Sequence, residues 1–148
     1  MADTTPLAPL QGIHHVRVTV TDIQRSKDFY STVFGADPAI DATDKIDEEG
    51  ATQDPKRFFG GCIFQVEGQL FGLRPVARTG DRFDSTRVGL DHVSFGVPSK
   101  ADLTAAAERL DAAGVVNGGV LPLEGTGMSI LSFQDPDDIN LELVAPEE

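Results

Sequence analysis

Polar and apolar residues alternate along residues 12–20, "GIHHVRVTV", and this pattern predicts a β-strand with two different faces. His15 and Arg17 share one face. The other face is apolar, and we expect a helix to cover it because it consists of Val16, Val18 and Val20. His15 and Arg17 are therefore expected on the open face of a sheet.

A helix is predicted over residues 26–34, "SKDFYSTVF", beginning at Asp22 or Ser26 and ending at Gly35. Residues 36–57 are polar and acidic and are interpreted as a long loop with at most a poor strand. The apolar segments "GGCIFQVEG" and "QLFGLRPVA" then predict two strands joined by a turn near Gly68. The first half of the chain therefore has the element order βαβββ.

The second half repeats the first. "GIHHVRVTVTD", residues 12–22, aligns without a gap with "GLDHVSFGVPS", residues 89–99, so that His15 matches His92. A predicted helix from Ser99 to Gly114 follows, and then three apolar segments, "GGVLPLE", "GMSILSF" and "INLELVA". The repeat predicts an α+β fold of two tandem βαβββ modules, which span residues 12–78 and 89–146. Residues 1–11 are expected to be a flexible N-terminus and residues 79–88 a linker.

The repeat also distinguishes the adjacent histidines, since His14 matches Asp91 and is expected to pack near the helix or make a polar contact. A lone carboxylate inside the last strand, Glu142 in "INLELV", needs a cation if it points inward. Two imidazoles and one carboxylate on open sheet faces are a ligand set that holds a divalent first-row metal. His15, His92 and Glu142 are thus predicted to bind one metal ion, which could be Fe, Mn, Zn or Ni.

Three segments, "HHVRVTVTDIQRSKDFYSTVFG", "GLDHVSFGV" and "FQDPDDINLELV", resemble the vicinal oxygen chelate superfamily. That superfamily includes glyoxalase I, methylmalonyl-CoA epimerase, fosfomycin-resistance transferases, extradiol dioxygenases and bleomycin-binding proteins. The resemblance implies one domain over residues 12–146, whose two mixed sheets curl into a cup-shaped half-barrel with helices on the outer faces. It also implies metal ligands at His15, His92 and Glu142, and a homodimer.

A departure from the family pattern involves arginine. Aligning "FGLRPV" with "INLELV" places Arg74 where the second module has Glu142. Glyoxalase I and the epimerase carry an acidic residue there, so these two activities are disfavoured. Arg17 and Arg74 share the predicted open face and could bind an anionic substrate through its carboxylate or phosphonate. Alternatively, Arg74 pairs with an acidic side chain such as Glu142, which would break the metal site.

Charge and cysteine content exclude several classes of partner. A formal net charge of -12 opposes binding to nucleic acid or to an anionic membrane surface. The single cysteine, Cys62, rules out an intrachain disulfide and favours a reducing compartment. The N-terminal residues lack the pattern of a signal peptide, so a cytoplasmic protein is expected.

Two functions remain open. The first is a small metal-dependent enzyme whose metal chelates an oxygenated small molecule, with lyase, transferase or dioxygenase chemistry undecided. Extradiol cleavage usually needs a further acid–base histidine, and His14 is expected on the wrong face. The alternative is a metal-free binding protein of the bleomycin-resistance type.

Overall fold

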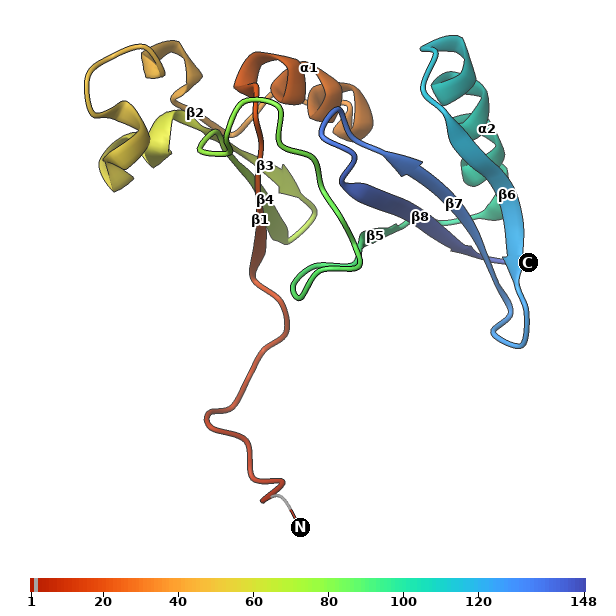
Figure 1. The fold of residues 1–148 in the computed structure, drawn as a ribbon. Coiled ribbons are helices and arrows are strands. Elements are labelled where there is room, and N and C mark those ends of the chain that lie inside the picture. Colours follow the sequence, from red (N-terminus) through yellow and green to blue (C-terminus); the bar gives the residue numbers. More distant parts are fainter. Residues whose placement is uncertain (2) are drawn as a thin grey trace. The chain divides into compact units, whose positions relative to one another are not determined.

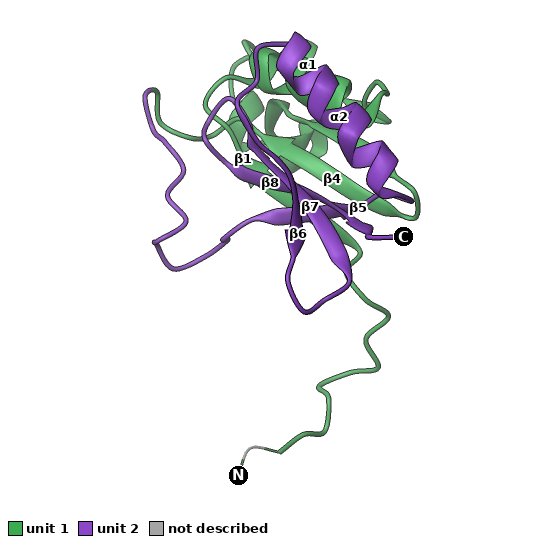
Figure 2. Cartoon of the chain, turned by 90° about the vertical axis from the view of Figure 1, so that its right-hand side faces the viewer, with its two compact units in different colours: residues 1–79 green, residues 80–148 purple. Residues whose placement is uncertain are grey.

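The computed structural model describes Met1 and residues 3–148 (Figure 1). The chain forms two compact units, residues 1–79 and 80–148, which are coloured separately in Figure 2. In the part of the chain that is described, each unit contains one α-helix and one four-stranded mixed sheet. None of the described helices is long and apolar enough to span a membrane.

The first unit has the sheet order β1-β4-β3-β2, in which β1 runs parallel to β4 and the other pairs are antiparallel. The predicted long loop contains the two-residue strand β2 and two short 3₁₀ segments, Thr43–Lys45 and Ala51–Gln53. A third segment, Pro55–Gly60, begins at the end of this loop and is kinked at Phe58 and Phe59. The elements of this unit are β1 (His15–Thr19), α1 (Ile23–Phe34), β2 (Ile40–Asp41), β3 (Cys62–Val66) and β4 (Gln69–Arg74).

The second unit repeats this connectivity with the order β5-β8-β7-β6. Strand β5 runs parallel to β8, which lies between β5 and β7 as expected for a strand inside its own sheet. The elements are β5 (Val93–Gly96), α2 (Lys100–Ala112), β6 (Asn117–Leu123), β7 (Met128–Gln134) and β8 (Asn140–Pro146). The predicted α+β fold of two βαβββ modules is confirmed, and both sheets are open rather than closed barrels.

Both α-helices begin at a side chain that caps the first turn, and α1 ends at a glycine. The carboxylate of Asp22 accepts a hydrogen bond from the backbone N–H of Arg25 at 3.1 Å, so Asp22 and not Ser26 caps α1. Gly35 ends that helix with a φ of 64°, in the left-handed region where glycine has no steric penalty. In α2 the Ser99 side chain accepts from the N–H of Asp102 at 3.3 Å.

One face of each sheet is covered by its own helix, as the valine pattern predicts. In the first unit Val18 and Val20 are buried, and the Tyr30 and Phe34 rings of α1 pack against Phe71. In the second unit the core is formed by Leu103 of α2 with Leu131 and Ala145. Side chains of opposite phase on these strands therefore project from the face away from the helix.

Candidate functional site

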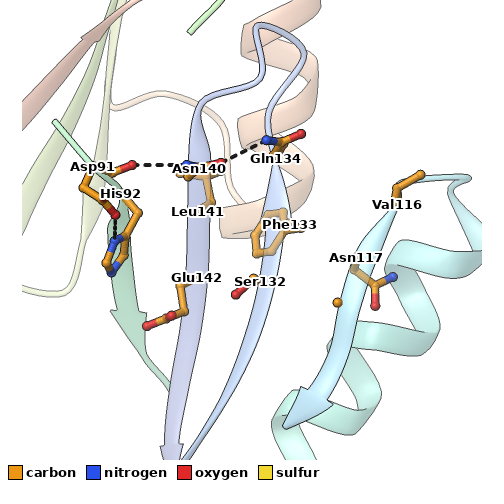
Figure 3. A pocket seen from close by; sticks show the side chains of 11 residues that line it. Asp91, His92, Val116, Asn117, Ser132, Phe133, Gln134, Asn140, Leu141 and Glu142 are labelled. Atoms are coloured by element: carbon orange, nitrogen blue, oxygen red, sulfur yellow. Dashed lines mark hydrogen bonds and ion pairs between the residues drawn. The ribbon is translucent and has the colours of Figure 1, made fainter. Parts of the chain in front are cut away.

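A groove of about 460 Å³ lies on the second unit, along the face of the sheet away from α2 (Figure 3). It brings together two of the predicted metal ligands, His92 and Glu142. The groove is lined by Asp91, His92, Val116, Asn117, Gly118, Ser132, Phe133, Gln134, Asn140, Leu141 and Glu142.

Glu142 is placed on this face by the alternation of β8, since its neighbour Leu141 is buried on the other side. The strand ladders set Glu142 between Ser94 of β5 and Ser132 of β7. The hydroxyl of Ser94 donates to Glu142 Oε1 at 2.8 Å. This hydrogen bond orients the carboxylate, and within the described part of the second unit it leaves Oε2 without a protein partner.

His92 lies immediately before β5 and is held by its sequence neighbour. Its Nδ1 is 2.6 Å from Asp91 Oδ1, so Nδ1 carries the proton and Nε2 is left as an acceptor or metal ligand. The backbone of this segment is tied to the sheet, because Asn140 Nδ2 donates to the carbonyl of Asp91 at 3.3 Å. Gln134 Nε2 in turn donates to Asn140 Oδ1 at 2.9 Å (Figure 3).

His15 begins β1 in the first unit and is exposed. Its Nδ1 lies 3.0 Å from Nδ1 of His14, and the two rings meet edge to face. Of the two expectations for His14, packing near the helix is wrong and a polar contact is confirmed. His14 is exposed and lies against His15, because it precedes β1 and does not follow that strand's alternation. In both repeats, therefore, the side chain of the preceding residue contacts Nδ1 of the histidine.

The donor types in these places fit a divalent first-row metal, since imidazole nitrogen and carboxylate oxygen are its common ligands. The second unit brings together His92 and Glu142, while His15 belongs to the first unit. Over Met1 and residues 3–148, no group of three or more His, Cys, Asp or Glu side chains is gathered closely enough to hold a metal by itself.

The strand ladders correct the predicted position of Arg74. Arg17 lies opposite Gly72 in the first unit, and its counterpart in the repeat, Ser94, lies opposite Glu142 in the second. Gly72, not Arg74, therefore occupies the place of Glu142. The alignment was displaced by two residues, a shift that keeps every side chain on the same face and leaves the hydrophobic pattern intact. An acidic residue is still absent from this place in the first unit.

Arg17 and Arg74 both project from the open face of the first sheet, as predicted, and are half-buried. Asp91 and Ser94, which orient His92 and Glu142, were not predicted as site residues. The turn at Phe58 and Phe59, which contacts both arginines, was not predicted as part of a site either. Ser94 could have been found from the repeat, because it matches Arg17. Asp91 could not, because its match, His14, was not a site candidate. The turn, at Phe58 and Phe59, has no partner in the second module.

Residues 12–143 match the model of the Glyoxalase/Bleomycin resistance protein/Dioxygenase superfamily. The chain is 27% identical over 145 residues to the putative ring-cleaving dioxygenase MhqA of Bacillus subtilis (strain 168), covering 94% of this chain and 42% of that protein. This chain thus spans less than half the length of that relative.

Two solved structures are similar in fold. A glyoxylase/bleomycin resistance protein/dioxygenase domain from Frankia sp. EAN1pec has 30% sequence identity and a TM-score of 0.73, covering 95% of both chains. A point mutant of the fosfomycin resistance protein FosX from Listeria monocytogenes, complexed with Mn(II) and 1S,2S-dihydroxypropylphosphonic acid, has 19% identity and a TM-score of 0.69. That match covers 93% of this chain and 94% of FosX. By the family match, the chain belongs to the glyoxalase/bleomycin resistance protein/dioxygenase superfamily.

Proposed function

We propose that the protein is a metal-dependent enzyme in which His15, His92 and Glu142 bind one divalent metal ion. A small oxygenated substrate would take the coordination positions that three protein ligands leave open. The observation that carries this proposal is the placement of His92 and Glu142 on one groove face, each oriented by a hydrogen bond to the atom that is not the proposed ligand atom. Such orienting contacts are typical of metal ligands.

Each neighbouring group would have a defined task. Asp91 would keep the proton of His92 on Nδ1, which leaves the lone pair of Nε2 available to bind a metal. Ser94 fixes Glu142 Oε1 and leaves Oε2 to bind a cation. A metal ion held there would supply Lewis acidity, which stabilises negative charge on substrate oxygen atoms.

The reaction class is supported by two similarities. The curated relative is described as a putative ring-cleaving dioxygenase, and the FosX structure holds Mn(II) with a phosphonic acid. The position of His14 removes one argument against ring cleavage, because its ring lies beside His15 instead of on the helix-covered face. Ring cleavage and addition to a phosphonate substrate are therefore the two activities to assay.

The decisive experiment is elemental analysis of the full chain purified without chelators. We expect about one transition metal per chain in the native protein, and its loss in Glu142→Ala and His92→Ala. Glu124→Ala is the matched control, because Glu124 is an exposed glutamate in a turn of the same unit. The identity of the metal would separate iron chemistry from manganese or zinc chemistry.

Two results would contradict the proposal. One is a native protein that carries no metal and does not bind added Fe, Mn, Ni or Zn. The other is equal metal content in Glu142→Ala and Glu124→Ala. Either result would leave the metal-free binding protein of the bleomycin-resistance type, whose small-molecule ligand would be sought by calorimetric titration.

A further inference from the structure

Two guanidinium groups lie side by side on the open face of the first sheet. Arg17 is on β1 and Arg74 is the last residue of β4, and the ladder sets Arg17 opposite Gly72, two residues before Arg74. Residues two apart on a strand share a face, so both side chains emerge opposite α1. This face thus carries two adjacent positive charges.

Among the described residues, one hydrogen-bond donor of each guanidinium group has no partner. Nε of Arg17 and Nε of Arg74 are buried and make no hydrogen bond. In the described part of the chain, only one other buried side-chain polar atom, Oγ of Ser26, is in the same state. Buried donors without partners are rare in folded proteins and need a specific explanation.

Within residues 3–79, neither arginine forms an ion pair with an acidic side chain. Among the ion pairs described in residues 3–79, Asp41 pairs with Lys27 at 2.6 Å, and Arg57 pairs with Asp54 and Glu48. Burial first, and then the charge of Arg74, lower the pKa of Arg17. The chain has 24 acidic and only 12 basic side chains, so acidic partners are abundant in the sequence.

The two arginines are held by one turn. The Arg74 Cζ atom lies 3.8 Å from the ring centroid of Phe59, and Arg17 Cζ lies 5.2 Å from the same centroid. Arg17 Nη2 also donates to the carbonyl of Phe58 at 3.1 Å. An arginine stacked on an aromatic ring keeps its in-plane donors at the edge of the stack, where they remain directed at a ligand.

The turn adopts an unfavourable backbone conformation. Phe58 and Phe59 have φ values of 48° and 57°, in the left-handed region that side-chain-bearing residues rarely adopt. The N–H of Phe59 donates to the carbonyl of Asp54 at 3.0 Å, and the N–H of Gly61 donates to the carbonyl of Phe58 at 3.0 Å. Gly61 is required here, because a Cβ atom would lie 1.9 Å from the carbonyl oxygen of Leu73. Strain of this kind concentrates at functional sites.

We propose that Arg17 and Arg74 form a binding site for the oxyanion of the substrate, a carboxylate or a phosphoryl group. A planar guanidinium pairs with such groups through two parallel hydrogen bonds, and an anion would satisfy the buried Nε donors and relieve the repulsion between the two charges. This inference rests on the proposed function in assigning the anion to the substrate. The binding itself needs no metal.

The test is isothermal titration of the full chain, freed of metal with a chelator, against inorganic phosphate and, separately, acetate at low ionic strength. We expect saturable binding of at least one probe. Arg17→Gln and Arg74→Gln should each weaken it at least tenfold, as expected for a lost hydrogen bond to a charged group. Arg87→Gln is the matched charge control, because the Arg87 side chain is 83% exposed in the second unit.

Tighter binding of phosphate would assign phosphoryl substrates, and tighter binding of acetate would assign carboxylates. Arg17→Lys and Arg74→Lys keep the charge but lose the planar donors, so several-fold weaker binding is expected if the glutamine variants do not fold. The proposal is overturned if the native chain binds neither probe, or if Arg87→Gln weakens binding as much as the other glutamine variants. Since no metal is present, such a failure leaves the metal proposal intact.

Discussion

The side chain of Arg17 lies directly over Gly72, where a Cβ atom would come within 3.1 Å of Arg17 Cγ and 3.5 Å of its Nε. The equivalent pair in the second unit is Ser94 and Glu142, joined by a hydrogen bond. The position that carries the carboxylate of Glu142 in the second unit is thus occupied in the first unit by Gly72, which lies under the cationic side chain of Arg17. The small size of Gly72 is what lets Arg17 lie flat on the sheet.

Gly72→Ala should therefore displace Arg17. The new methyl group would lie closer to Arg17 than an ordinary van der Waals contact, so the flexible arginine side chain will move. We expect this to lower the free energy of unfolding by about 1 kcal/mol. We expect phosphate or acetate binding to weaken several-fold, measured by titration, with stability measured by urea unfolding. Gly96→Ala is the control, because a Cβ atom there meets nothing within 4 Å. Unchanged anion binding in Gly72→Ala would contradict this account.

Ser94→Ala should lower metal affinity by about tenfold, the lower end of the effect of removing a group that orients a metal ligand. The reason is the lost 2.8 Å hydrogen bond to Glu142 Oε1. Ser132→Ala is a close control: Ser132 lies opposite Glu142 on β7, and its hydroxyl makes no hydrogen bond among the described residues. Competition with a fluorescent chelator would measure both affinities, and equal affinities in the two variants would refute the assigned role of Ser94.

Asp91→Ala should reduce metal affinity about 10- to 100-fold, because His92 loses the carboxylate that fixes its proton on Nδ1. Asp91→Asn should recover part of this loss, since the amide oxygen still accepts a hydrogen bond from Nδ1–H. The nitrogen NMR shifts of His92 would show whether its proton distributes over both nitrogens in Asp91→Ala. If both variants bound metal as tightly as the native protein, an orienting role for Asp91 would be ruled out.

The pH dependence of stability tests whether Cys62 is buried in the core of the first unit. The residue is fully buried on β3, and burial first, then the charge of Asp41, raise the pKa of its thiol from 9.0 to about 12. Between pH 9 and 12 the thiol stays protonated in the folded chain but ionises in the unfolded chain. Its contribution to stability is therefore complete below pH 9 and is lost between pH 9 and 12, by up to about 1.4 kcal/mol per pH unit.

Urea unfolding of the native chain and of Cys62→Ala at pH 8 to 11 would give the free energy of unfolding of each as a function of pH. The difference between the two slopes measures the contribution of the thiol. Other titrating groups cancel in that comparison. The folded thiol should also resist alkylation at pH 8 and react once the chain is unfolded. Equal slopes, or rapid alkylation of the folded chain, would mean that Cys62 is accessible.

The fold and much of the site were predictable because they depend on local patterns. The burial of Val18 and Val20 follows from strand alternation, and the repeat of His15 at His92 identifies the two modules. Alternation also places Glu142 on the open face of its sheet, where it shares a groove with His92.

Other features depend on register and loop conformation, which hydrophobic patterns do not encode. A two-residue displacement hid the match between Gly72 and Glu142, since every side chain stays on its face. His14 was misplaced because β1 begins one residue later, at His15. No propensity predicts two consecutive phenylalanines in the left-handed region, so the turn at Phe58 and Phe59 could not be inferred.

Strands β1 and β5 are the outermost strands of their own sheets, bonded on one side only, while β4 and β8 are bonded on both. His15 and His92 therefore lie on or next to outer strands, which open more easily by local fluctuation than strands bonded on both sides. Amide hydrogens along β1 and β5 should exchange with deuterated solvent sooner than those of β4 and β8. A ligand that ties each histidine to its surroundings would slow that exchange, so these two outer strands can report occupancy of the site without any chemical label.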